Sequence, residues 1–108
     1  MTVKIGGHAG RVGVGGRNQQ FALYCATKVA GENIAVLSAG TDGIDGNSSA
    51  AGAIVDGTTR ERARSRGLPL DHALVEFNAF PLFDALDDSI ITGPTGNNIR
   101  DLQVLLAW

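Results

Sequence analysis

The chain has 108 residues, of which 44% are hydrophobic and 19% charged, and its formal net charge is −2. This length is typical of one domain that buries a core without disulfides or metals. The mild acidity gives no support for binding nucleic acid or an anionic membrane. The single cysteine, Cys25, excludes a disulfide framework and a cysteine-based zinc site. No apolar run is long enough to span a bilayer and no signal-peptide pattern is present, so a cytoplasmic location is expected.

The first half of the chain alternates strand-like and helix-like segments. Residues 2–5 alternate in polarity as a short strand does, and Met1 directly before them favours a genuine start of the chain. A helix is predicted over 18–30, because alanines at 22, 26 and 30 form a face suited to close packing on a sheet. The apolar run 34–39 predicts a central strand that is covered on both faces. Residues 48–51 predict the start of a short helix, and 53–55 fit either a strand or the end of that helix.

Three short helices are predicted between residues 58 and 88. The first should end at Gly67, because glycine readily adopts the left-handed conformation that ends a helix. Their predicted N-caps are Thr58, in a capping box with Glu61, then Asp71, and then Asn78.

Two further strand-like segments follow, at 89–92 and 99–108. Strands that alternate with helices predict a single α/β domain with a mostly parallel sheet flanked by helices. In such sheets, ligands bind beyond the carboxyl ends of the strands. Glycine-rich loops follow the segments 34–39 and 89–92, so both loops are expected at this edge of the sheet.

Three glycine-rich polar runs stand out, at residues 15–20, 40–46 and 93–98. Glycines at such junctions let backbone N–H groups approach a ligand closely, and a helix N-terminus adds partial positive charge. Together the three runs predict one polar cleft for a small anion or a phosphate-bearing molecule.

Arg17 is the strongest single candidate, because a guanidinium beside a helix start can hold a carboxylate or phosphate bidentately. Its alternative role is a salt bridge that fixes the loop. Ligand contact is the favoured role for Asp42. For Asp45, capping of backbone N–H groups is at least as strongly favoured as ligand contact. These two are also the candidate ligands if magnesium binds, and Asp101 is expected to be structural. The remaining candidates for ligand contact are Gly15, Gly16, Asn18, Thr41, Thr95 and Asn98, with turn capping an equal alternative for the last two.

The same runs carry a family resemblance. The motifs are Gly-Gly-Arg-Asn-Gln (15–19), Gly-Thr-Asp-Gly-Ile-Asp-Gly (40–46), Ala-Ala-Gly-Ala (50–53), Gly-Pro-Thr-Gly (93–96) and the closing Asn98, Asp101 and Leu102. They resemble the MOFRL domain, the C-terminal domain of class II glycerate 2-kinases, some of which are named hydroxypyruvate reductases. The resemblance covers nearly the whole chain. Residues 1–108 are therefore expected to form one MOFRL-like domain without the family's N-terminal kinase domain.

The resemblance implies that glycerate, ATP or ADP, and Mg²⁺ meet between this domain and the N-terminal domain. It places Arg17, Asp42, Thr95 and Asn98 at cleft-lining positions. Phosphoryl transfer needs charge neutralisation from several directions, and the family's catalytic lysine belongs to the other domain. The chain is therefore expected to bind a small anionic ligand without being a complete kinase.

Two alternatives remain open. A partner chain or a second copy could complete the site and restore glycerate kinase activity in trans. The exposed cleft could instead serve as an oligomer interface of a structural module, because apolar surface left uncovered usually finds a partner. A homo-oligomer is expected, and a separate chain that supplies the N-terminal domain in trans is a further possible partner.

Overall fold

The computed structural model of the chain describes residues 13–96 and 100–108. The predicted strand at 2–5 and the candidate Asn98 lie outside the described residues. The elements in chain order are α1 (Arg17–Lys28), β1 (Ile34–Gly40), β2 (Gly52–Asp56), α2 (Thr59–Ser65), α3 (Leu70–Val75), α4 (Ala79–Leu86), β3 (Ser89–Ile90) and β4 (Asp101–Ala107).

The four strands form one sheet in the order β3-β2-β1-β4, and every neighbouring pair is antiparallel. The prediction of a mostly parallel sheet is therefore wrong. A parallel pair needs a long crossover, usually a helix, whereas the connection between β1 and β2 at residues 41–51 contains no helix. The predicted helix start at 48–51 is also wrong, because these residues form turns that lead into β2.

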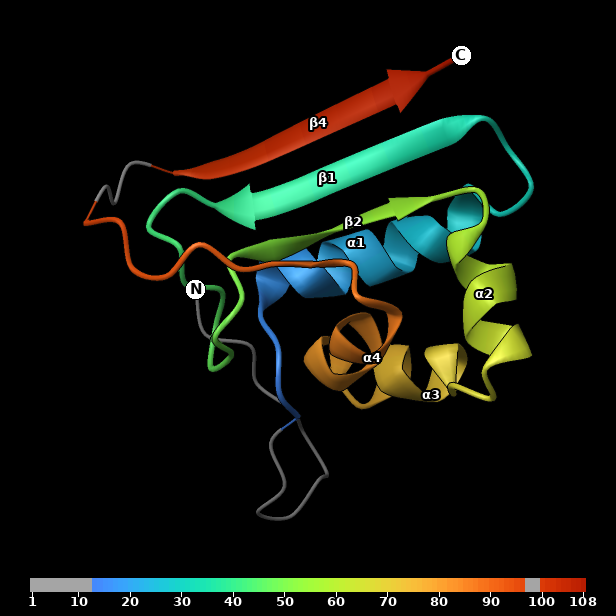
Figure 1. The fold of residues 1–108 in the computed structure, drawn as a ribbon, viewed down its shortest axis with the longest axis horizontal. Helices are drawn as coiled ribbons and strands as arrows, with labels where there is room; N and C mark the ends of the chain where they lie inside the picture. Colours follow the sequence, from blue (N-terminus) through green and yellow to red (C-terminus); the bar gives the residue numbers. More distant parts are fainter. Residues whose placement is uncertain (1–12, 97–99) are drawn as a thin grey trace.

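The helices cover one face of part of the sheet. Helix α1 packs across β1 and β2, while α2, α3 and α4 gather beside it and β4 stands at the far edge (Figure 1). Along β1 the buried residues alternate, so that Val36 and Ser38 face inward and Leu37 lies on the opposite face. The core between these layers includes Ala22, Leu23, Ala26, Val36, Val55, Phe83 and Leu86.

The predicted starts of the three short helices need correction. Thr58 precedes α2, but its hydroxyl donates to Oδ1 of Asp56 at 2.6 Å and caps no helix N–H, so the capping box is absent. Helix α3 begins at Leu70, which places Asp71 inside the first turn. Asn78 does precede α4, yet its side chain accepts the N–H of Val14 from the other end of the chain. No helix in the described part of the chain is long and apolar enough to cross a membrane.

The different burial of two phenylalanines predicts different losses of stability when each is replaced by alanine. Phe83 on α4 is fully buried, whereas Phe21 on α1 is exposed. We expect Phe83→Ala to lower the free energy of unfolding by about 3–5 kcal/mol, through lost burial and the cavity left behind. The matched control Phe21→Ala should cost about 1 kcal/mol or less. Urea unfolding followed by circular dichroism measures both, and equal losses would contradict the packing described above.

Candidate functional site

The three glycine-rich loops meet at one edge of the sheet. Strands β1 and β3 run in the same direction because each is antiparallel to β2, so the loops that follow them leave from the same edge. The N–H of Thr95 donates to the carbonyl of Asp42 at 3.0 Å, and the Thr95 hydroxyl donates to the carbonyl of Thr41 at 2.6 Å. Gly15 and Asn47 join the first loop to the second through two hydrogen bonds, at 2.8 and 3.0 Å. We call residues 13–20, 40–47 and 93–96 together with Asp101 the loop cluster.

Close backbone approach explains two of the glycines. A Cβ at Gly43 would lie 2.1 Å from the carbonyl oxygen of Gly93, and the φ of +84° at Gly43 itself favours glycine. A Cβ at Gly16 would lie 2.4 Å from backbone and side-chain carbons of Asp45. These glycines therefore permit the contacts between loops, whether or not a ligand is bound.

The N-terminus of α1 is occupied by a carboxylate of the chain itself. Buried Asp45 accepts the backbone N–H of Asn18 on Oδ1 at 3.0 Å and that of Gln19 on Oδ2 at 2.8 Å. The side-chain amides of the same two residues donate to the same oxygens, at 3.2 and 3.1 Å. Capping, the alternative role considered for Asp45, is what the structure shows. The helix N–H groups that were expected to meet a ligand anion already have an anionic partner.

A buried polar network extends from Asp45 into the sheet and the second loop. The Ser38 hydroxyl on β1 donates to Oδ1 of Asn18 at 2.7 Å, and Nε2 of Gln19 donates to Ser48 Oγ at 2.7 Å. Gln19 Oε1 is buried and has no partner among the described residues. Gln19, Ser38 and Ser48 were not among the predicted site residues. The available signal was Ser38, the only polar residue in the apolar run 34–39.

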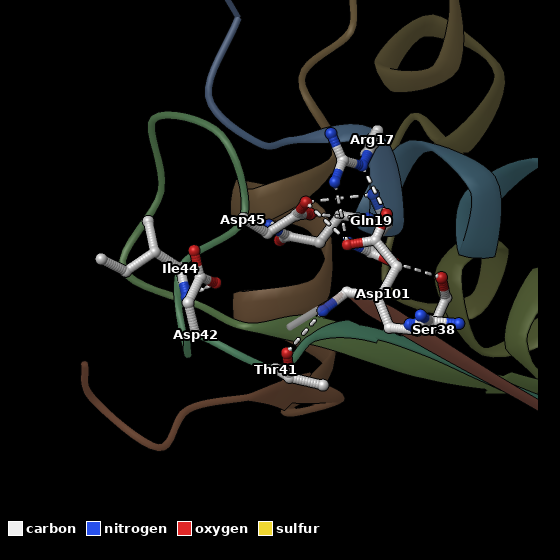
Figure 2. Close-up of polar contacts among 10 residues, drawn as sticks. Arg17, Gln19, Ser38, Thr41, Asp42, Ile44, Asp45 and Asp101 are labelled. Atoms are coloured by element: carbon white, nitrogen blue, oxygen red, sulfur yellow. Dashed lines mark hydrogen bonds and ion pairs between the residues drawn. The ribbon is translucent and has the colours of Figure 1, made fainter. Parts of the chain in front are cut away.

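Arg17 lies against Asp101 at the start of β4 (Figure 2). Its Nε donates to Oδ2 and its Nη2 donates to Oδ1, the latter at 3.1 Å, while Nδ2 of Asn18 also donates to Oδ1 at 3.1 Å. The hydrogen bond from Arg17 holds the pKa of the Asp101 carboxyl below its usual range. The salt bridge considered as an alternative for Arg17 is thus formed. The arginine side chain nevertheless remains 43% exposed.

Three carboxylates influence Arg17. The hydrogen bond with Asp101 is the main cause that raises the pKa of this guanidinium, and the charges of Asp45 and Asp42 add to it. Among the described residues, Arg17 is thus one cation beside three carboxylates. Their charges oppose an anionic ligand beside Arg17 unless further positive charge lies nearby.

The two candidate magnesium ligands, Asp42 and Asp45, accept hydrogen bonds from the chain itself. Both oxygens of Asp45 already accept N–H groups, so this side chain does not suit a cation. Oδ1 of Asp42 accepts the N–H of Ile44 at 3.0 Å, the Asx-turn contact. Within residues 13–96 and 100–108, no three His, Cys, Asp or Glu side chains gather as metal ligands would. The predicted site residues that the structure brings together are Gly15, Gly16, Arg17, Asn18, Thr41, Asp42 and Thr95.

The fold and the loop cluster define a small α/β domain in which three polar loops meet at one sheet edge. Residues 1–101 match the MOFRL family, and the chain belongs to this family. It is 35% identical over 105 residues to a glycerate 2-kinase of Pyrococcus horikoshii and 41% identical over 93 residues to a D-glycerate 2-kinase of Thermotoga maritima. These matches cover 97% and 85% of this chain but only 23% and 22% of the relatives.

Solved structures agree with this assignment. A crystal structure of a Pyrococcus horikoshii protein superimposes with a TM-score of 0.86 at 33% identity, covering 98% of this chain and 23% of that one. The crystal structure of glycerate kinase from Thermotoga maritima gives a TM-score of 0.85 at 40% identity, covering 89% of this chain and 23% of that one. The chain therefore spans less than a quarter of the length of these relatives.

The capping role of Asp45 predicts that Asp→Asn substitution destabilises the fold at position 45 but not at position 42. In Asp45→Asn, one oxygen becomes an NH₂ group that faces two N–H donors, so we expect a loss of about 2 kcal/mol or more in the free energy of unfolding. Asp42→Asn is the matched control, because asparagine supports an Asx turn as well as aspartate does. It should change stability by about 0.5 kcal/mol or less. Chemical unfolding measures both, and an unaffected Asp45→Asn variant would rule out the capping role.

The lowered pKa of Asp101 predicts a pH-dependent contribution to stability. A carboxyl with a depressed folded-state pKa stabilises fully above its unfolded-state pKa of about 3.9. This contribution disappears as the pH falls through the folded-state value. Asp101→Asn should therefore lower Tm at pH 6–7, and the difference from wild type should shrink towards pH 2–3. The same substitution should have less effect in an Arg17→Ala background, whereas a Tm difference that stays constant with pH would contradict the ion pair.

Proposed function

We propose that this chain forms the part of a glycerate 2-kinase-type site that contacts a small carboxylate or phosphate ligand, and that it does not transfer a phosphoryl group alone. The observation that carries the proposal is the Arg17 guanidinium. It is fixed by Asp101 and is still 43% exposed, at the place where the glycine-rich loops meet. Family membership supports it, since relatives of this chain are named glycerate 2-kinases.

The guanidinium of Arg17 has N–H donors that Asp101 does not use. It carries five N–H groups in a planar fork, and the bonds to Asp101 use only one from Nε and one from Nη2. Among the described residues, the Nη1 group and the second Nη2 hydrogen have no acceptor and remain for a ligand oxygen. Because Asp101 already orients the side chain, less conformational entropy is lost when a ligand binds.

The remainder of a glycerate 2-kinase-type protein would supply the missing positive charge. The carboxylates around Arg17 oppose binding of an isolated anion, and no three His, Cys, Asp or Glu side chains of the described residues gather as metal ligands would. Phosphoryl transfer depends on cations that neutralise the transferred group from several sides. In this proposal, Mg²⁺ and ATP are held mainly by residues outside this chain, and Arg17 orients the acceptor or its phosphorylated product.

Thermal unfolding with ligands tests the proposal. We would measure Tm with D-glycerate, 2- and 3-phosphoglycerate and Mg-ADP, alone and combined. A ligand present at 100 times its Kd stabilises by about 2.7 kcal/mol, which raises Tm by on the order of ten degrees for a domain of this size. The rise should vanish in Arg17→Ala. It should persist in Arg60→Ala, whose side chain is similarly exposed at 44% and paired with Asp71 away from the loop cluster.

Three outcomes of the thermal unfolding measurement would count against the proposal or its interpretation. A ligand-induced rise that survives Arg17→Ala would remove Arg17 from the binding role. A rise that is lost equally in both variants would indicate a general loss of stability instead of a lost ligand contact. No rise in wild type with any ligand would contradict binding by the chain alone.

A second candidate function is glycerate phosphorylation in trans. It is favoured by the combination of a TM-score of 0.85 with coverage of only 23% of the Thermotoga maritima glycerate kinase chain. We would mix this chain with that relative lacking the matching region, and follow ATP-dependent phosphorylation of D-glycerate. Turnover should require both pieces and fall in Arg17→Ala. Turnover by this chain alone would contradict the view that it is an incomplete site.

A further inference from the structure

Strand β4 (Asp101–Ala107) is an edge strand that carries unusual apolar exposure. It pairs only with β1, and no other strand of the described residues lies along its outer edge (Figure 1). Edge strands usually avoid association through lysine, proline, bulges or short length. Residues 102–108 include no charged residue and no proline. Instead their large side chains are 48% to 68% exposed, namely Leu102, Val104, Leu105, Leu106 and Trp108.

The hydrogen-bond pattern shows which backbone groups point outward. The N–H of Trp108 donates to the carbonyl of Asn33 at 3.0 Å, and the N–H of Thr41 donates to the carbonyl of Arg100 at 3.1 Å. Even-numbered residues of this strand therefore direct their backbone groups towards β1. Because an antiparallel ladder alternates, residues 101, 103, 105 and 107 direct their N–H and C=O groups to the open edge. Each offers one donor and one acceptor to another strand.

We propose that β4 pairs with β4 of a second copy of this chain, antiparallel about a twofold axis at Val104. In this register, Asp101 lies opposite the partner's Ala107 and Gln103 lies opposite the partner's Leu105. All four outward-facing residues of both strands are then paired. A shift by two residues in either direction leaves one of them unpaired on each strand. The contact is isologous, so it closes at a dimer and does not propagate into a fibre.

Side chains match in the same register. Val104 lies opposite the partner's Val104, and Leu102 lies opposite the partner's Leu106, so that apolar residues meet in the close non-hydrogen-bonded pairs. Asp101, the only charged residue of β4, faces an alanine and not its own copy. Arg100 lies opposite the partner's Trp108, an arrangement suited to a cation–π contact. This self-complementarity is what favours a second copy over an unrelated partner.

Cysteine cross-linking tests the register directly. In a Cys25→Ser background, which removes the only native thiol, Val104→Cys places two cysteines opposite each other at a Cα separation of about 4.5 Å. That separation falls within the range of a disulfide. Leu102→Cys is the matched control, because its copies lie four residues apart along the strands, at about 13 Å. After mild oxidation, a non-reducing gel should show a covalent dimer for Val104→Cys and none for Leu102→Cys. The reverse result would overturn the register.

Sedimentation equilibrium tests the association itself. The wild-type chain should be a dimer. Gln103→Pro removes one outward N–H but no bond to β1, so it should give a folded monomer, with folding checked by circular dichroism. Gln103→Thr keeps the N–H and should remain a dimer. A monomeric wild type, including one that associates only with the remaining part of a glycerate 2-kinase, would overturn the proposal, as would a dimer that persists in Gln103→Pro.

Discussion

The contact on which the site depends is the one between the Asp45 carboxylate and the N-terminus of α1. A buried carboxylate is costly unless hydrogen bonds and a favourable field satisfy it. Here two backbone N–H groups, two side-chain amides and the positive end of the helix do so. The loop after β1 is thereby tied to α1. The chain thus fills with its own carboxylate the position that a ligand phosphate often takes at a helix start.

The side-chain amide of Asn18 connects the buried helix cap to the surface. Nδ2 of Asn18 donates both to the buried carboxylate of Asp45 and to the partly exposed carboxylate of Asp101. Its neighbour Arg17 begins the helix, so its backbone is fixed by the cap and its guanidinium by Asp101. The result is an arginine that is held in place beside three carboxylates of the described residues. In the proposed function, a further cation would offset these carboxylates when an anion binds.

Periodicity predicted the main helix and the central position of the strand at 34–39, but the expected cover on both faces of that strand is wrong, because the described helices lie on one face only. The short helices lie where the capping patterns placed them, although none of the three predicted side-chain caps forms. Strand direction was not predictable, because the apolar run 34–39 fits a parallel central strand as well as an antiparallel one between two neighbours. The expected convergence of two loops rested on that wrong pairing. The loops still meet, because β1 and β3 run alike with β2 between them. Capping by Asp45 depends on its approach to a helix 27 residues earlier, which local spacing does not reveal.

Strand β4 contributes to both the loop cluster and the exposed apolar edge of the sheet. Its first residue, Asp101, orients Arg17, while the residues after it expose apolar side chains and an open backbone edge. A strand held along one side only, with most of its side chains in water, belongs to the least stable part of a fold. Any strand that pairs with β4 would restrain it along both sides and so hold Asp101 more firmly against Arg17. The proposed association at the edge and the proposed ligand contact at the loop cluster would therefore be linked through one short strand, although the two surfaces share no side chain other than Asp101.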